Sequence, residues 1–133
     1  MPLTVPVPDT QQVRCKVFTA NLAQAAATYD LATCNAVGGV VILSVDIYCV
    51  TAGATFTSVA IATNDTTVVP ILSAVEGAVA NLTAGKNIVK AFATQTYLHT
   101  SKKIQYTIVG ATGTGSLRVI VRYQPSVVGA DLQ

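Results

Sequence analysis

The side chains that most often carry chemistry are few and scattered in this chain. The cysteines are Cys15, Cys34 and Cys49, without a C-x-x-C spacing, and His99 is the only histidine. A zinc site needs about four such ligands, so we predict no metal site and no cofactor. An odd number of cysteines is also unlike a disulfide framework, so free thiols are expected.

A catalytic nucleophile or base is not indicated either. The chain has no G-x-S-x-G motif, and Ser101 and Ser116, which lie nearest to basic or imidazole groups, are expected at strand ends, where serine is an ordinary turn residue. His99 falls in a polar turn with no orienting partner suggested, as expected of a solvated loop histidine. The six acidic residues are dispersed singly, unlike paired catalytic carboxylates. We therefore predict that the protein is not an enzyme.

A glycine-rich stretch, Gly110-x-x-Gly113-x-Gly115, superficially resembles a phosphate-binding loop. Its spacing is reversed from G-x-G-x-x-G, and it joins two alternating runs instead of opening a helix. The pattern therefore predicts the connection of a β-hairpin, where glycine occupies the positive-φ positions.

Composition limits the possible classes of protein. The 133 residues are 51% hydrophobic and 11% charged, with a net charge of +2, which predicts a single domain with an apolar core. No apolar run reaches the roughly 18 residues of a membrane span, and the N-terminus lacks the features of a signal peptide. The small net charge gives no reason to expect nucleic acid. We predict neither a membrane nor a nucleic-acid partner.

Alternation of apolar and polar residues is the main structural signal, and threonine and valine favour strands. It predicts an all-β fold of about eight short strands: an antiparallel β-sandwich, jelly-roll-like, with an immunoglobulin-like sandwich as the alternative. Residues 37–49 and 54–62 are expected to pair as a hairpin. The helical spacing of Ile71, Leu72, Val75 and Val79 after Pro70 predicts one short helix near 70–80. The other expected strands are residues 13–18, 23–31, 88–92, 96–99, 104–109 and 117–123.

The same alternation assigns side chains to the two faces of each strand. Val13, Cys15 and Val17 are expected to face the core with Cys49, and Arg14 and Lys16 to face outward. Arg118 and Arg122, four residues apart, should share an outer face. Two interpretations of this pair remain open. Either it belongs to a solvated face, or it forms a basic stripe with Arg14, Lys16, Lys102 and Lys103 that binds an acidic protein surface.

The two ends of the chain are unusually apolar. Residues 1–12 form an expected extended arm, with Pro2, Pro6 and Pro8 between Leu3, Val5 and Val7; residues 13–125 form the sandwich domain, and residues 126–133 a C-terminal tail. The ends either fray or lie against a neighbouring subunit.

Charge scarcity favours association. Residues 37–49, 54–62 and 104–109 contain only one charged residue, Asp46. Exposed sheet edges normally carry charges, so these strands must be central, covered by the arms, or joined to another chain. Together with the apolar ends, this predicts a symmetric homo-oligomer.

Residues 103–125 (KIQYTIVGATGTGSLRVIVRYQP) resemble the closing hairpin of small β-sandwich virion proteins of tailed bacteriophages, including capsid decoration (cement) proteins. The charge-poor body and the proline-punctuated arm are similar to that group too. The resemblance implies a jelly-roll-like fold, a homotrimer or, less favoured, a dimer, and binding to the major capsid protein of the phage head. The location it implies is the capsid surface of the virion, after synthesis in the host bacterial cytoplasm.

The function predicted from the sequence is therefore that of a non-enzymatic capsid decoration protein that binds and stabilises the phage head. The expected oligomer and capsid contacts are Leu3, Val5 and Val7 of the arm, with Arg118 and Arg122. One alternative is a structural sandwich of a phage tail, neck or fibre. A glycan-binding module is a minor alternative, because it would need exposed aromatic rings and the chain has no tryptophan.

Overall fold

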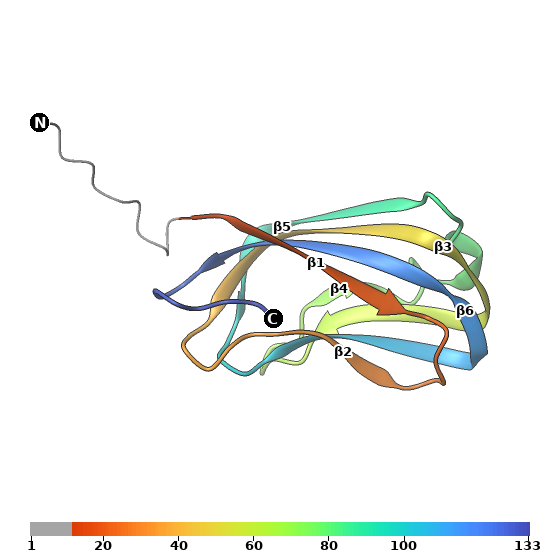
Figure 1. Ribbon diagram of the computed structural model, residues 1–133, viewed down its shortest axis with the longest axis horizontal. Coiled ribbons are helices and arrows are strands. Elements are labelled where there is room, and N and C mark those ends of the chain that lie inside the picture. Colours follow the sequence, from red (N-terminus) through yellow and green to blue (C-terminus); the bar gives the residue numbers. More distant parts are fainter. Residues whose placement is uncertain (1–11) are drawn as a thin grey trace, which may run out of the picture.

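The computed structural model describes residues 12–133, except for the side chains of residues 93–95, and it is all-β, as predicted (Figure 1). Within the described residues the only helical element is a single 3-10 turn, η2. The strands and this turn are β1 (Arg14–Asn21), β2 (Thr28–Thr33), β3 (Val40–Thr63), β4 (Pro70–Leu72), η2 (Val79–Asn81), β5 (Asn87–Leu98) and β6 (Lys103–Pro125).

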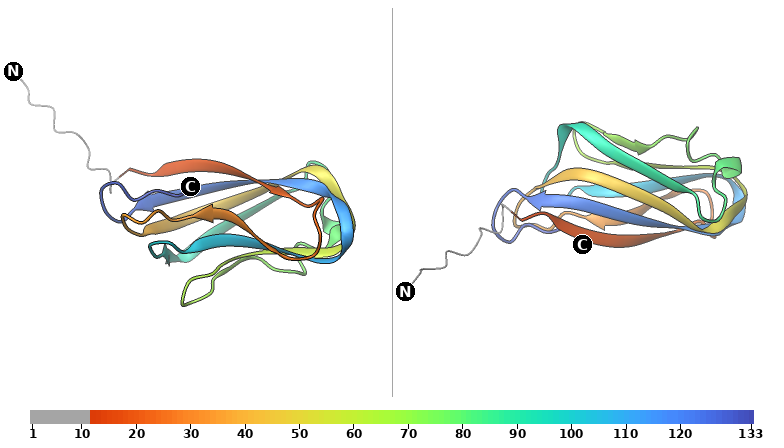
Figure 2. Two further views of the ribbon diagram at one scale, coloured as in Figure 1. Left: turned by 60° about the horizontal axis from the view of Figure 1, so that its bottom comes forward. Right: turned by 90° about the horizontal axis from the view of Figure 1, so that it is seen from above.

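Two long strands, β3 and β6, organise the sheet. They run antiparallel along their whole length, from Val40 opposite Pro125 to Thr63 opposite Ile104. The strand order is β1-β6-β3-β4, with β2 also on β6 and β5 also on β3. Both long strands bend in the middle, so the sheet turns back over itself as two layers (Figure 2).

Each layer contains one half of each long strand. The β1/β5 layer has the order β1-β6-β3-β5 and contains residues 40–51 and 116–125 of the long strands. The β2/β4 layer has the order β2-β6-β3-β4 and contains residues 54–63 and 103–110. Counted twice each, the bent strands give about eight segments, and this pairing is compatible with the double-sheet jelly roll expected from the sequence.

Both predicted hairpins are wrong. Residues 54–62 continue β3 and residues 110–115 continue β6, so the halves of each strand pair with the other long strand instead of with each other. Successive register shifts between Cys49 and Ser58 bend β3. Positive φ angles at Thr55, Gly110 and Gly115 mark the same corner. Glycine is needed there, but for a bend and not for a hairpin turn.

The predicted helix near 70–80 is also wrong. Pro70 pairs with Ala62 and Leu72 with Ile61, which makes this segment an edge strand, where a missing N–H is tolerated. The chain then runs along the edge of β3, where the carbonyl of Gly77 accepts a hydrogen bond from the N–H of Val59 at 2.9 Å. Val75, one of the helical-spacing residues, is exposed. The apolar residues at helical spacing therefore do not form one buried face.

The core lies between the layers and follows the predicted alternation along β6. Leu117, Val119, Val121 and Tyr123 are all fully buried. In β3 a bulge between Ile42 and Ser44 changes which residues face inward. Ile42 is buried before the bulge and Val45 after it, so the residues that face the core change from even to odd numbers along the strand.

The predicted orientation of β1 is wrong. Val13, Cys15 and Val17 face outward and are exposed. Ala20 and Leu22, further along the chain, are fully buried, so the even-numbered residues are the ones that face the core. A strand has a period of two, so burial of these even-numbered residues turns the odd-numbered ones to solvent.

The charge-poor segments lie in β3 and β6, the two interior strands of the sheet order. Of the three explanations offered for their lack of charge, the central position is therefore sufficient. Charge scarcity alone no longer requires a partner, and an argument for association needs surface residues.

The last residues of the chain pack onto β2. Leu132 is fully buried and bridges to Cys34, and Thr33 and Gln133 exchange backbone hydrogen bonds of 2.7 and 2.8 Å. Asp131 accepts hydrogen bonds from the Lys16 ammonium at 2.7 Å and from the Tyr123 hydroxyl. Burial, reinforced by Asp131, raises the pKa of Tyr123 to about 12. The tail therefore links β1, at the edge of one layer, to β2, at the edge of the other.

Thiol labelling tests the unexpected orientation of β1. Cys15 is exposed, whereas Cys34 and Cys49 are buried, and burial raises the pKa of both buried thiols. Because the thiolate is the reactive form, iodoacetamide at neutral pH is expected to label one cysteine in the native protein and three after denaturation, as counted by mass spectrometry. Rapid native labelling of Cys34 or Cys49 would contradict this packing.

Candidate functional site

The most distinctive surface is the outer face of the β1/β5 layer. The register places Val17 opposite Ile120, Ile120 opposite Asp46, and Asp46 opposite Val89, which forms one row across four strands. Side chains in register on neighbouring strands share a face. We call this surface the valine–arginine face, and it consists of Val17, Asp46, Tyr48, Val89, Arg118, Ile120 and Arg122.

Its apolar members are open to solvent. Val17 is 56% exposed and Val89 62%, at opposite edges of the layer, and Tyr48 is exposed between them. Ile120 at the centre is half-buried. Large exposed apolar patches often mark surfaces that contact another protein.

The two predicted arginines lie together on this face, but only one of them has an ion-pair partner. Arg122 donates from Nη1 to Asp46 Oδ2 at 2.8 Å. The other oxygen of that carboxylate, Oδ1, is buried and has no hydrogen-bond partner among the described residues. Arg118 lies opposite Tyr48, and its side chain has neither an ion pair nor a hydrogen bond within residues 12–133. The face therefore carries one compensated and one uncompensated arginine.

The basic stripe, one of the two open interpretations, does not extend to Arg14, Lys16 or Lys103. Lys16 and Arg14 approach Asp131, at 2.7 and 3.6 Å, and so turn away from the valine–arginine face. Lys103 pairs with Asp30 at 2.6 Å on the β2/β4 layer. The remaining predicted contacts, Leu3, Val5 and Val7, lie outside the described residues.

The outer face of the β2/β4 layer has a different character. Thr28 and Thr107 hydrogen-bond through their hydroxyls at 2.9 Å, and Asp30 accepts from Gln105 as well as from Lys103. These hydrogen bonds lower the pKa of Asp30. Threonines, a glutamine and a closed ion pair are typical of a solvated surface. Val109 is exposed on the same face. The two sides of the molecule therefore differ in the number of exposed apolar side chains and in the unpaired arginine.

Sequence reasoning missed a carboxylate–histidine pair. Asp65 Oδ2 accepts the backbone N–H of His99 at 2.8 Å and lies 2.7 Å from His99 Nδ1. Burial alone would raise the pKa of Asp65, but hydrogen bonds from His99 and the backbone of Thr66 lower it below its ordinary value. His99 also contacts the Tyr97 ring edge-on. The pair ties the loop after β3 to the turn before β6, and a 34-residue separation hides it in the sequence.

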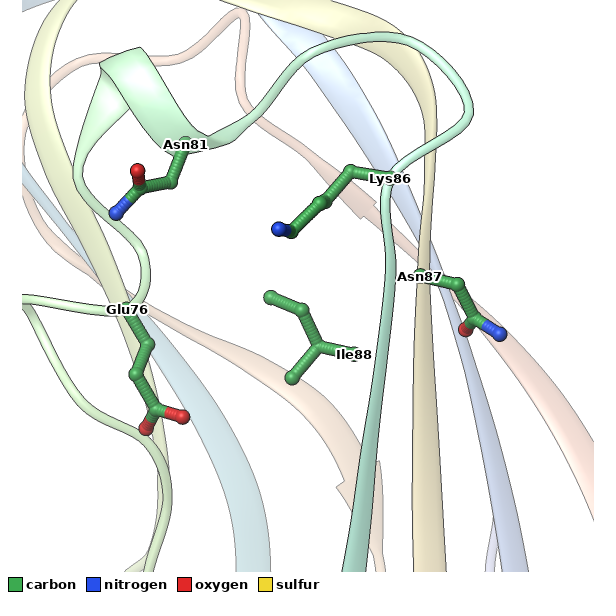
Figure 3. Close-up of a pocket in the computed structure, with 5 residues that line it drawn as sticks. All are labelled: Glu76, Asn81, Lys86, Asn87 and Ile88. Carbon is green, nitrogen blue, oxygen red and sulfur yellow. The ribbon is translucent and has the colours of Figure 1, made fainter.

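A pocket of about 380 Å³ opens beside the start of β5 (Figure 3). Lys86 and Ile88 point into it, and Asn87 is turned away. Glu76 is already bound by Lys90 and Ser73, and Asn81 donates to the Val75 carbonyl at 3.0 Å. Lys86 is thus the charged lining group that forms no ion pair or side-chain hydrogen bond with the described residues, and Ile88 is the apolar side chain beside it.

Residues 12–133 hold no group of three histidine, cysteine, aspartate or glutamate side chains arranged to bind a metal ion. They also contain no helix with the length and apolar character required to cross a membrane.

No protein-family model and no curated protein matches this chain. A solved structure of infectious bursal disease virus, Gx strain, aligns with 90% of this chain and 38% of that chain, at 14% sequence identity and a TM-score of 0.31. The aligned part thus spans well under half of the viral chain. A similarity this weak indicates no function, which has to come from the residues described above.

Proposed function

We propose that this chain is a non-enzymatic structural protein of a virus particle and that it assembles through the valine–arginine face. The observation that carries the proposal is the inequality of the two outer faces. Both faces hold one closed ion pair, but one adds threonines, a glutamine and a single exposed valine, Val109. The other presents Val17, Val89, Tyr48 and an uncompensated arginine. Apolar residues, tyrosine and arginine are enriched where protein interfaces are most tightly packed.

The specific role we propose is that of a bacteriophage capsid decoration protein, which binds the major capsid protein on the outside of the head as a homo-oligomer. The resemblance of residues 103–125 to such proteins and the all-β fold support this role. Several weak contacts made by one oligomer bind together far more tightly than each alone. Self-association through the face would thereby hold the protein on the shell and link neighbouring capsid subunits.

The arm residues Leu3, Val5 and Val7 remain our proposed contacts with the shell. Arg118 and Arg122 remain our proposed contacts between copies in the oligomer. The homotrimer suggested by the resemblance also remains a prediction. Light scattering on the purified chain measures its mass directly.

Co-sedimentation with undecorated phage heads, scored by the fraction of protein in the pellet, tests the function. The full chain is expected to pellet with the heads. Val17→Glu places a charge on the face and should prevent self-association. Because the avidity of the oligomer is then lost, we expect the apparent affinity of this variant for heads to fall about 100-fold. Val109→Glu is the matched control, since Val109 is 50% exposed and lies outside the face.

Two results would overturn the proposal. The first is a full chain that stays in the supernatant with heads but binds isolated tails. The second is equal loss of binding by Val17→Glu and Val109→Glu, which would show that the face has no particular role.

A further inference from the structure

Two groups on the valine–arginine face lack the partner that their chemistry calls for. The Arg118 guanidinium forms no ion pair or hydrogen bond within residues 12–133, and Asp46 Oδ1 accepts no hydrogen bond there. A buried carboxylate oxygen without a donor is costly and rare in native proteins. The guanidinium is a donor and the Asp46 carboxylate is an acceptor, but Oδ1 itself is buried, so a donor from outside meets the exposed part of this carboxylate.

The two groups lie on neighbouring strands, one row apart. Asp46 is opposite Ile120, and Arg118 is opposite Tyr48, two residues further along β3. Within one chain the carboxylate is instead bound by Arg122, through Oδ2. The Asp46 side chain keeps 21% of its surface exposed, so a guanidinium approaching from outside meets the same carboxylate.

We infer that the valine–arginine face binds a second copy of this chain across a two-fold axis. In such a contact the same patch occurs on both sides, and if residue i meets residue j, then j meets i. Arg118 of each copy then meets Asp46 of the other, and each Asp46 carboxylate lies between two guanidinium groups, its own Arg122 and the incoming Arg118. The face carries both complementary charges and is therefore self-complementary.

The apolar row fits the same contact. Val17, Ile120 and Val89 flank the charges, and two copies packed face to face remove these side chains from water. A two-fold contact of this kind closes with two copies, so it cannot by itself build a trimer. The inference rests on the proposed function only in assigning this face to assembly.

A pair of charge reversals tests the contact. Arg118→Asp alone brings like negative charges together at both symmetric positions, and Asp46→Lys alone brings like positive charges together. Each is expected to raise the dimer dissociation constant about 100-fold in sedimentation velocity. In an equimolar mixture, the heterodimer has opposite charges at both positions, so mixing is expected to restore dimers, seen as the mixed mass in native mass spectrometry.

The controls separate this contact from general effects of charge or folding. Lys86→Asp reverses another exposed cation, whose side chain points into the pocket beside the start of β5 and not onto the face, and should leave the dissociation constant unchanged. Far-ultraviolet circular dichroism checks folding, and Asp46→Asn replaces Asp46→Lys if the latter does not fold, with a smaller loss of dimer expected. A dimer that survives Arg118→Asp, or singly reversed variants that fail to associate when mixed, would overturn the inference.

Failure of the inference can be distinguished from failure of the proposed function. A monomeric full chain that still pellets with phage heads would overturn the two-fold contact and leave the decoration role. A dimer that is sensitive to both charge reversals but never binds heads would support the two-fold contact and overturn the decoration role.

Discussion

Replacing Gly113 by alanine is expected to lower the free energy of unfolding by about 3 kcal/mol, the upper end of the usual cost of overpacking. Gly113 lies at the corner where β6 passes from one layer to the other. A Cβ atom there would lie 1.8 Å from the Ala54 carbonyl oxygen and 2.9 Å from the Phe56 nitrogen. These are backbone atoms of the bent part of β3, so neither can rotate away as a side chain would.

Gly85→Ala is the matched control for this change. Gly85 has a φ of +86°, but no atom lies within 4 Å of the added Cβ, so the substitution costs only backbone strain, about 1 kcal/mol. Urea denaturation followed by circular dichroism measures both variants. If Gly113→Ala is no less stable than Gly85→Ala, the two bends are not in close contact and the corner is described wrongly.

Local alternation predicted the buried side of β6 because both of its halves keep a strict period of two. Leu117, Val119 and Tyr123 are buried, as are Ile104 and Ile108 before the corner. The period breaks elsewhere because of features without a local signal. The bulge after Ile42 changes the phase of β3, and the packing of Ala20 and Leu22 fixes the phase of β1 from the far end of the strand.

The sequence could not distinguish a hairpin turn from a bend. Glycines with positive φ suit both, and the alternation on either side is the same. Whether the chain forms a hairpin turn or a bend depends on the pairing of β3 with β6, for example of Val40 with Pro125. Pairing between residues so far apart leaves no signal in a short stretch of sequence. The candidate face was found only in part for the same reason. The four-residue spacing placed Arg118 with Arg122, but Val17 was assigned to the core.

Deleting residues 131–133 is expected to cost about 4 kcal/mol, a large part of the 5–15 kcal/mol that stabilises a typical domain. Complete burial of a leucine such as Leu132 contributes about 1.5–3 kcal/mol. The rest comes from the Tyr123 hydroxyl, which loses its acceptor Asp131, and from the two backbone hydrogen bonds between Thr33 and Gln133. The measurement is urea denaturation at neutral pH, with Val128→Ala, an exposed change in the same tail, as the control.

Acid should remove part of the same stabilisation from the full chain. Burial alone would raise the pKa of Asp131, but hydrogen bonds from Lys16 and Tyr123 lower it below its ordinary value of 3.8. A lowered carboxyl pKa means that the contribution is complete above the ordinary value and is lost as the pH falls through the lowered pKa. The difference in stability between the full and shortened chains should therefore narrow as the pH falls below about 4. A difference that stays constant into strong acid would mean that the Asp131 carboxylate contributes nothing and that Leu132 and the backbone hydrogen bonds between Thr33 and Gln133 hold the tail.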